Sequence, residues 1–147
     1  MKKLFLLISI CLGLITTQSA FAQEKAFKKF GDTQVFYSAF NSSFIAADIA
    51  NIYKITRGKD KGLVNIAFVP KGAAQGQTAL VGGTVNNLLA QQQQLDFTEV
   101  REGDAVYYLA PFTFDNEDPL TFTIHVRPAD SDTTHTFTFQ RTFYHDQ

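Results

Sequence analysis

The chain has 147 residues, of which 45% are hydrophobic and 14% aromatic, with 13 basic and 14 acidic side chains. A formal net charge of −1 excludes the strongly basic surface that is typical of nucleic-acid-binding domains. A single cysteine excludes an internal disulfide, so the hydrophobic core alone has to hold the fold together.

Residues 1–22 have the pattern of a cleavable export signal. Two lysines precede an uncharged apolar run over residues 4–15, and Ala20-Phe21-Ala22 matches an A-x-A cleavage site. The apolar run is shorter than the roughly 20 residues that a membrane-spanning helix needs. We therefore expect cleavage after Ala22, which leaves residues 23–147 as one soluble domain without cysteine.

The charge of the mature segment is uneven. Residues 23–71 carry eight basic and four acidic side chains, a net charge of +4, and residues 72–147 carry three basic and ten acidic ones, a net charge of −7. The basic half does not alternate arginine with aromatic residues, so we expect no nucleic-acid partner.

The first part of the mature chain predicts strands around one short helix. Residues 27–41 have the aromatic composition of one or two strands, with a break at Gly31-Asp32. Isoleucines at helical spacing after the polar residues 41–43 predict a helix over 46–53. The clearest strand is 63–70, because its apolar side chains alternate.

The next part predicts weaker strands. Residues 78–85 include Gly82-Gly83, which indicates a bulge or a close backbone approach. The glutamine-rich residues 86–94 are interpreted as a connection. Residues 95–101 predict a strand with a bulge near Thr98-Glu99, because the apolar residues change parity there.

The last part completes the fold class. Residues 105–112 are apolar on both faces, as in a central strand, with Pro111 at its end or at an edge. Residues 120–127 and 134–143 alternate around a turn at 129–132 and predict a hairpin. Seven or eight strands with one short helix predict an all-β, immunoglobulin-like sandwich, with a closed barrel as the alternative.

One short segment supports the sandwich. Asp104-Ala105-Val106-Tyr107-Tyr108-Leu109 resembles the tyrosine-corner strand of antibody domains, with Leu109 where a cysteine would stand. The resemblance implies a structural role for Tyr107, whose hydroxyl would anchor a turn. It implies no antibody function.

Side chains alternate between the two faces of a strand, and this alternation shows whether two histidines could share a metal ion. In the predicted hairpin, His125 points away from the core and His135 shares the core face with Phe137. A four-residue loop at 129–132 places His125 opposite Thr136. The two histidines then lie on opposite faces, so we predict no histidine metal site and no cofactor.

Acidic turns offer a different candidate metal site. Glu102 and Asp104 precede the strand 105–112, and Asp130 and Asp132 follow the strand 120–127, so chain direction brings all four to one end of the sandwich. Carboxylates that converge in this way bind Ca²⁺. A calcium-dependent module is therefore an alternative function, although acidic residues are also ordinary in solvated turns.

Catalytic motifs are missing from the mature sequence. It has no cysteine and no G-x-S-x-G nucleophile motif, and Ser42 and Ser43 are explained more simply as helix-capping residues. We therefore predict that the protein is not an enzyme. A small-ligand-binding protein or a hydrolase stays as an alternative, and it would require a concave pocket with convergent polar groups.

Several segments resemble a family of exported proteins from Gram-negative bacteria, the domain of unknown function 4426. They are the leader, the segments Phe36-Tyr37-Ser38-Ala39-Phe40-Asn41-Ser42-Ser43-Phe44, Gly62-Leu63-Val64-Asn65-Ile66 and Glu102-Gly103-Asp104-Ala105-Val106-Tyr107-Tyr108-Leu109, and the ending after Phe143. The resemblance implies a periplasmic location and no assigned activity.

We expect a non-catalytic periplasmic binding or accessory module that contacts a protein or the envelope. Contact would run through a sheet edge or through the loop at 41–44. Asn41, Ser42 and Ser43 are the candidate binding residues, because this loop places polar side chains between apolar ones and loops commonly carry binding sites.

Overall fold

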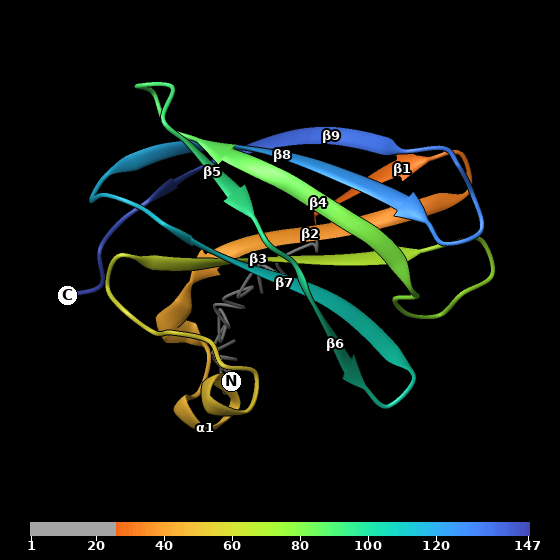
Figure 1. Ribbon diagram of the computed structural model, residues 1–147, viewed down its shortest axis with the longest axis horizontal. Coiled ribbons are helices and arrows are strands. Elements are labelled where there is room, and N and C mark those ends of the chain that lie inside the picture. The colour runs from red at the N-terminus through yellow and green to blue at the C-terminus, as the bar shows by residue number, and fades with distance from the viewer. Residues whose placement is uncertain (1–25) are drawn as a thin grey trace, which may run out of the picture.

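Two antiparallel sheets face each other in the computed structural model, which describes residues 26–147 (Figure 1). The predicted leader, residues 1–22, lies outside the described residues. The larger sheet has the order β1 (Phe27–Phe30), β2 (Thr33–Asn41), β3 (Lys61–Val69), β7 (Ala105–Thr113) and β6 (Thr98–Glu102). The smaller sheet has the order β5 (Gln92–Leu95), β4 (Ala79–Asn86), β8 (Asp118–Pro128) and β9 (His135–Phe143).

The predicted all-β sandwich is confirmed. The short helix expected over 46–53 is α1 (Ala47–Ile52), and a single 3₁₀ turn, η1 (Ser42–Phe44), precedes it. The described chain has nine strands rather than seven or eight, because part of the glutamine-rich segment pairs with β4 as β5. None of the helices between residues 26 and 147 has the length and apolar character to cross a membrane.

The segment 95–101 is not one bulged strand. β5 ends at Leu95 in the smaller sheet, and β6 begins at Thr98 in the larger one. Leu95 faces the interior, whereas Val100 lies on the outer face of the larger sheet. The parity change that suggested a bulge near Thr98-Glu99 is therefore the crossing of the chain between two sheets.

The paired glycines of β4 do not form a bulge. Gly82 pairs with His125 and Gly83 with Ile124 in unbroken register. The alternative expectation, a close backbone approach, is confirmed at Gly83, where an added Cβ would collide with the carbonyl oxygen of Thr123. An added Cβ at Gly82 would meet no atom within 4 Å.

The β8–β9 hairpin agrees with the prediction from alternation. His125 lies opposite Thr136, as the four-residue loop required, and its Nδ1 is 2.9 Å from the hydroxyl of Thr136. The inward residues of β8 are all buried: Leu120, Phe122, Ile124 and Val126.

Phenylalanine rings fill the space between the sheets. Phe122 is fully buried, stacks on Phe139 with ring centroids 4.7 Å apart, and meets Phe112 edge-on at 5.1 Å. Tyr37 of β2 packs on Phe137 of β9 at 5.3 Å. β9 therefore covers the β1–β2 edge of the larger sheet, and the β5–β6 crossing lies at the opposite edge.

Side chains join the two sheets where strand pairing stops. β6 pairs with β7 only as far as Leu109, so the backbone of Thr113 has no strand on that side. The carboxamide of Gln93 forms the two hydrogen bonds that a neighbouring strand would form with Thr113. Its Nε2 donates to the Thr113 carbonyl at 2.8 Å, and its Oε1 accepts from the Thr113 N–H at 2.9 Å. Pro111 lies in the same stretch, so its expected position at an edge is confirmed.

Candidate functional site

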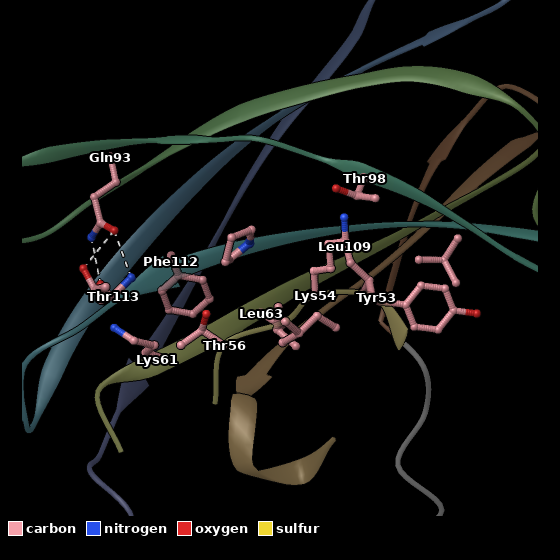
Figure 2. Close-up of a pocket in the computed structure, with 13 residues that line it drawn as sticks. Tyr53, Lys54, Thr56, Lys61, Leu63, Gln93, Thr98, Leu109, Phe112 and Thr113 are labelled. Carbon is pink, nitrogen blue, oxygen red and sulfur yellow. Dashed lines mark hydrogen bonds between the residues drawn. The ribbon is translucent and has the colours of Figure 1, made fainter. Parts of the chain in front are cut away.

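A groove of about 380 Å³ opens on the outer face of the larger sheet (Figure 2). Its floor consists of apolar side chains from three adjacent strands: Leu63 on β3, Leu109 and Pro111 on β7, and Val100 on β6. The segment 53–56, which follows α1, forms one wall. Gln93 and Thr113 close one end (Figure 2).

The groove exists because the chain returns over the sheet after α1. Lys54 adopts a left-handed backbone with φ of 55°, and its N–H donates to the carbonyl of Asn51 while the N–H of Ile55 donates to the carbonyl of Ala50. These bonds form a Schellman motif, which ends the helix sharply. The segment 53–56 then covers Leu63, which is only 1% exposed although it points outward.

The rim of the groove is positively charged. Residues 54–61 carry four basic side chains and one acidic one, a local net charge of +3. Lys54 and Lys61 line the groove itself. The ammonium group of Lys61 is 3.8 Å from the Asp60 carboxylate, and both side chains are partly exposed, so this ion pair is weak.

The three predicted binding residues, Asn41, Ser42 and Ser43, do not form a free binding surface. Ser42 is fully buried, and its hydroxyl accepts a hydrogen bond from the Gly58 N–H at 3.0 Å and donates to the Gly58 carbonyl at 3.2 Å. Asn41 donates to the Tyr144 carbonyl at 2.9 Å. Both side chains tie distant parts of the chain together.

The helix-capping role expected of Ser42 and Ser43 is also absent. They lie inside η1, and α1 has Ala46 at its N-cap, so neither helix has a side-chain cap. Ser43 instead contacts the tail: hydrogen bonds from Ser43 and Asn41 hold the pKa of the Asp146 carboxyl below its usual value.

The acidic turns predicted to share Ca²⁺ lie apart. Chain direction brings Glu102, Asp104, Asp130 and Asp132 to the same end of the sandwich, on the right of Figure 1. However, the β6–β7 turn lies at one edge of the sandwich and the β8–β9 turn at the other. Residues 26–147 contain no group of three or more His, Asp or Glu side chains that could hold a metal ion. The predicted calcium site is therefore not formed.

The anchoring hydroxyl expected of Tyr107 is found one residue later. Tyr107 lies on the outer face of the larger sheet, opposite Val100 on β6. The buried Tyr108 points inward, where its hydroxyl accepts from the Ala79 N–H at 2.9 Å and donates to Glu99 at 3.2 Å. Burial raises the pKa of Tyr108, and the nearby charge of Glu99 raises it further against the hydrogen bond from Ala79. Tyr108 thus anchors the start of β4.

Sequence reasoning missed the groove residues. The signal was present in the strand 105–112, which is apolar on both faces, and in Leu63, which breaks the polar side of β3. A strand that is apolar on both faces is usually covered by other parts of the chain on both faces. Here the outer face of the strand is covered only in part. What the sequence did not reveal was which segment lies above that face.

Comparison with known proteins places the chain in a family. A model of a domain of unknown function, DUF4426, matches residues 27–146. A DUF4426 family protein from Pseudomonas aeruginosa PAO1 has a crystal structure that superposes with a TM-score of 0.76 at 31% sequence identity. That match covers 86% of this chain and 100% of the Pseudomonas chain. No curated protein matches the chain.

A more distant likeness is to FetP from uropathogenic Escherichia coli strain F11, recombinantly expressed in the E. coli periplasm. Its TM-score is 0.56 at 12% identity, with 83% of this chain and 95% of FetP covered. A copper-bound variant of FetP gives a TM-score of 0.57 at 12% identity, with 82% and 95% covered. At this identity the likeness shows a shared fold alone. With a family model that spans 27–146 and a family member that is 31% identical, the chain belongs to the DUF4426 family.

Proposed function

We propose that this domain is a non-catalytic binding module and that the groove on the outer face of the larger sheet is its binding site. The observation that supports the proposal is an apolar floor within a cavity of about 380 Å³. Ligand pockets have volumes of about 300–1,000 Å³ and combine apolar walls with a few polar groups. Thr56, Thr98 and the two rim lysines supply such groups here.

The absence of catalysis is part of this proposal. The Ser42 hydroxyl is buried and hydrogen-bonded to backbone, which leaves it unsuited to attack a substrate. Within residues 26–147, the histidine rings form hydrogen bonds with the Thr136 hydroxyl and the Phe114 carbonyl rather than with a serine. A serine hydrolase needs a base beside its serine, and neither of these histidine contacts involves a serine.

We further propose that the protein works in the periplasm. The sequence of residues 1–22 supports export, and FetP, a fold relative, was expressed in the periplasm. The copper of the FetP variant is not carried over to this chain, because residues 26–147 contain no cluster of metal-binding side chains.

The groove proposal predicts that a bulky side chain on its floor abolishes binding of an apolar probe. N-phenyl-1-naphthylamine is neutral and brightens when it leaves water. We expect it to bind the wild-type protein, and we expect Leu109→Trp to weaken binding at least tenfold, because the indole would occupy the cavity. Fluorescence titration measures both affinities.

Leu80→Trp is the matched control for this experiment. Leu80 is an exposed leucine on β4 in the other sheet, so the same substitution there leaves the groove open and probe binding unchanged. No probe binding by the wild-type protein would contradict the proposed function. Equal loss in both variants would indicate a general effect of tryptophan instead of a site.

A second candidate function is contact with a protein partner through the tip of the β4–β5 hairpin. Leu88 and Leu89 are 80% and 79% exposed at a loop that projects from the sandwich (Figure 1). The Asn87 side chain holds this loop, since its Oδ1 accepts from the N–H groups of Leu89 and Gln91, both at 3.0 Å. Two adjacent leucines that are exposed to water on a hydrogen-bonded loop favour docking into an apolar pocket of a partner.

The tip suits a protein better than an anionic membrane surface. No basic residue lies between Lys71 and Arg101, and Arg141, which lines a shallow pocket with Leu88, donates a hydrogen bond to the Ala39 carbonyl. The tip therefore lacks the cluster of basic residues that attracts proteins to anionic lipid. A photocrosslinking residue at position 88, in cells of the natural host, should give a discrete protein adduct that Leu89→Ser weakens. The same residue at position 80 is the control, and an adduct to lipid alone would contradict a protein partner.

A further inference from the structure

We propose that the groove binds a free, single-chain alkyl carboxylate, with the chain on the apolar floor and the carboxylate at the rim, where the charges of Lys54 and Lys61 both attract it. This inference rests on the proposed function, because it names the ligand class of the same groove. It goes further by assigning each lysine a role in selecting a negatively charged head group.

The floor suits an apolar chain. Leu63, Val100 and Leu109 present only hydrocarbon to the cavity, and Tyr53 and Thr113 lie toward opposite ends of it (Figure 2). A volume of about 380 Å³ is near the lower limit for ligand pockets, about 300 Å³. The space therefore suits one medium-length alkyl chain and is too small for a two-chain lipid.

The rim selects a negative head group. Lys54 reaches across the groove from the wall, and Lys61 lies at the other end beside Thr56 (Figure 2). Lys54 forms no ion pair with any residue between 26 and 147, and Lys61 has only the long, partly exposed contact to Asp60. Their charges are thus available to a carboxylate, and the local net charge of +3 disfavours a cationic ligand.

The backbone of Lys54 gives an independent argument. Lys54 occupies the left-handed position of the Schellman motif, with φ of 55°, where glycine is the usual residue because it lacks a Cβ. A lysine there costs stability, and such strain is commonly retained where a side chain is needed for function. The Lys54 side chain, which a glycine at this position would lack, lines the groove.

The test compares three ligands with the same chain: decanoate, 1-decanol and decyltrimethylammonium, each below its micelle concentration. Displacement of N-phenyl-1-naphthylamine gives the affinities. We expect decanoate to bind at least tenfold more tightly than decanol, and decyltrimethylammonium to bind most weakly. The preference for decanoate should shrink as salt rises, because salt screens exposed charges.

Charge variants separate the roles of the lysines from general effects. The double variant Lys54→Gln/Lys61→Gln should lower decanoate affinity to the affinity of the same variant for decanol. Lys59→Gln removes an exposed charge of the same segment that does not line the groove, so it should keep most of the preference. Lys54→Gly should raise the melting temperature and still weaken decanoate binding, an opposite pair of effects that a merely structural lysine would not produce.

The possible failures are distinguishable. Equal affinity for decanoate and decanol would overturn the carboxylate assignment and leave the groove as a binding site for neutral ligands. Binding to phosphatidylglycerol vesicles without binding to monomeric decanoate would overturn the free-ligand assignment. If neither decanol nor the neutral probe binds, the proposed function itself fails.

Discussion

Phe122→Ala should lower the free energy of unfolding by about 3–5 kcal/mol, the range for removing a large buried aromatic side chain. Phe122 is fully buried at the centre of the sandwich, stacked on Phe139 and in edge contact with Phe112. These rings belong to strands of both sheets, so the cavity left behind cannot close without moving the sheets. Urea denaturation followed by circular dichroism measures the change.

Phe44→Ala is the control for this experiment. Phe44 lies in η1 and is 74% exposed, so its removal should change the free energy of unfolding by less than about 0.5 kcal/mol. A Phe122→Ala protein that unfolds at the wild-type urea concentration would contradict the central position of this ring. It would also contradict the pairing of β8 with β4 and β9, which places the ring there.

Adjacent glycines in β4 should respond in opposite directions to the same substitution. Gly83→Ala should destabilise the protein by about 1–3 kcal/mol, the usual cost of overpacking, because its Cβ would collide with the backbone carbonyl of Thr123. Gly82→Ala should be neutral or stabilising by up to about 1 kcal/mol, because its Cβ meets no atom and alanine restricts the unfolded chain.

The two alanine variants differ by one position in the same strand, so each serves as the control for the other. Thermal unfolding of both proteins gives the comparison. The reverse order of stability would show that β4 is shifted by one residue against β8, since a shift of one residue exchanges the faces of a strand.

Much of the fold followed from the sequence because the strands of the second half alternate without interruption. In β8 the inward side chains of Phe122 and Ile124 alternate with outward threonines, and this pattern fixed both the hairpin and the position of His125 opposite Thr136. The β5–β6 crossing did not follow. Local spacing records a change of parity near Thr98, but a bulge and a move to another sheet produce the same change.

The candidate site was predictable only in part. Asn41, Ser42 and Ser43 have the composition of a binding loop, but their side chains bond to residues far along the chain, such as Gly58 and Tyr144. The four acidic residues failed as a calcium site for a related reason. The direction of the chain determines the end of the sandwich at which a turn lies. The order of strands across each sheet, which places the two turns at opposite edges, depends on pairing between residues distant in sequence.

The crossing between β5 and β6 also affects how quickly the domain can fold. The inner strands pair with partners distant in sequence: Leu63 lies opposite Pro111, and Val85 lies opposite Phe122. Domains dominated by such non-local pairs fold in milliseconds to seconds. Because Asp96-Phe97 joins strands of both sheets, neither β5 nor β6 can settle until β4 and β7 are in place. The outer face of β6, and with it the groove floor at Val100, should therefore be among the last parts of the molecule to form.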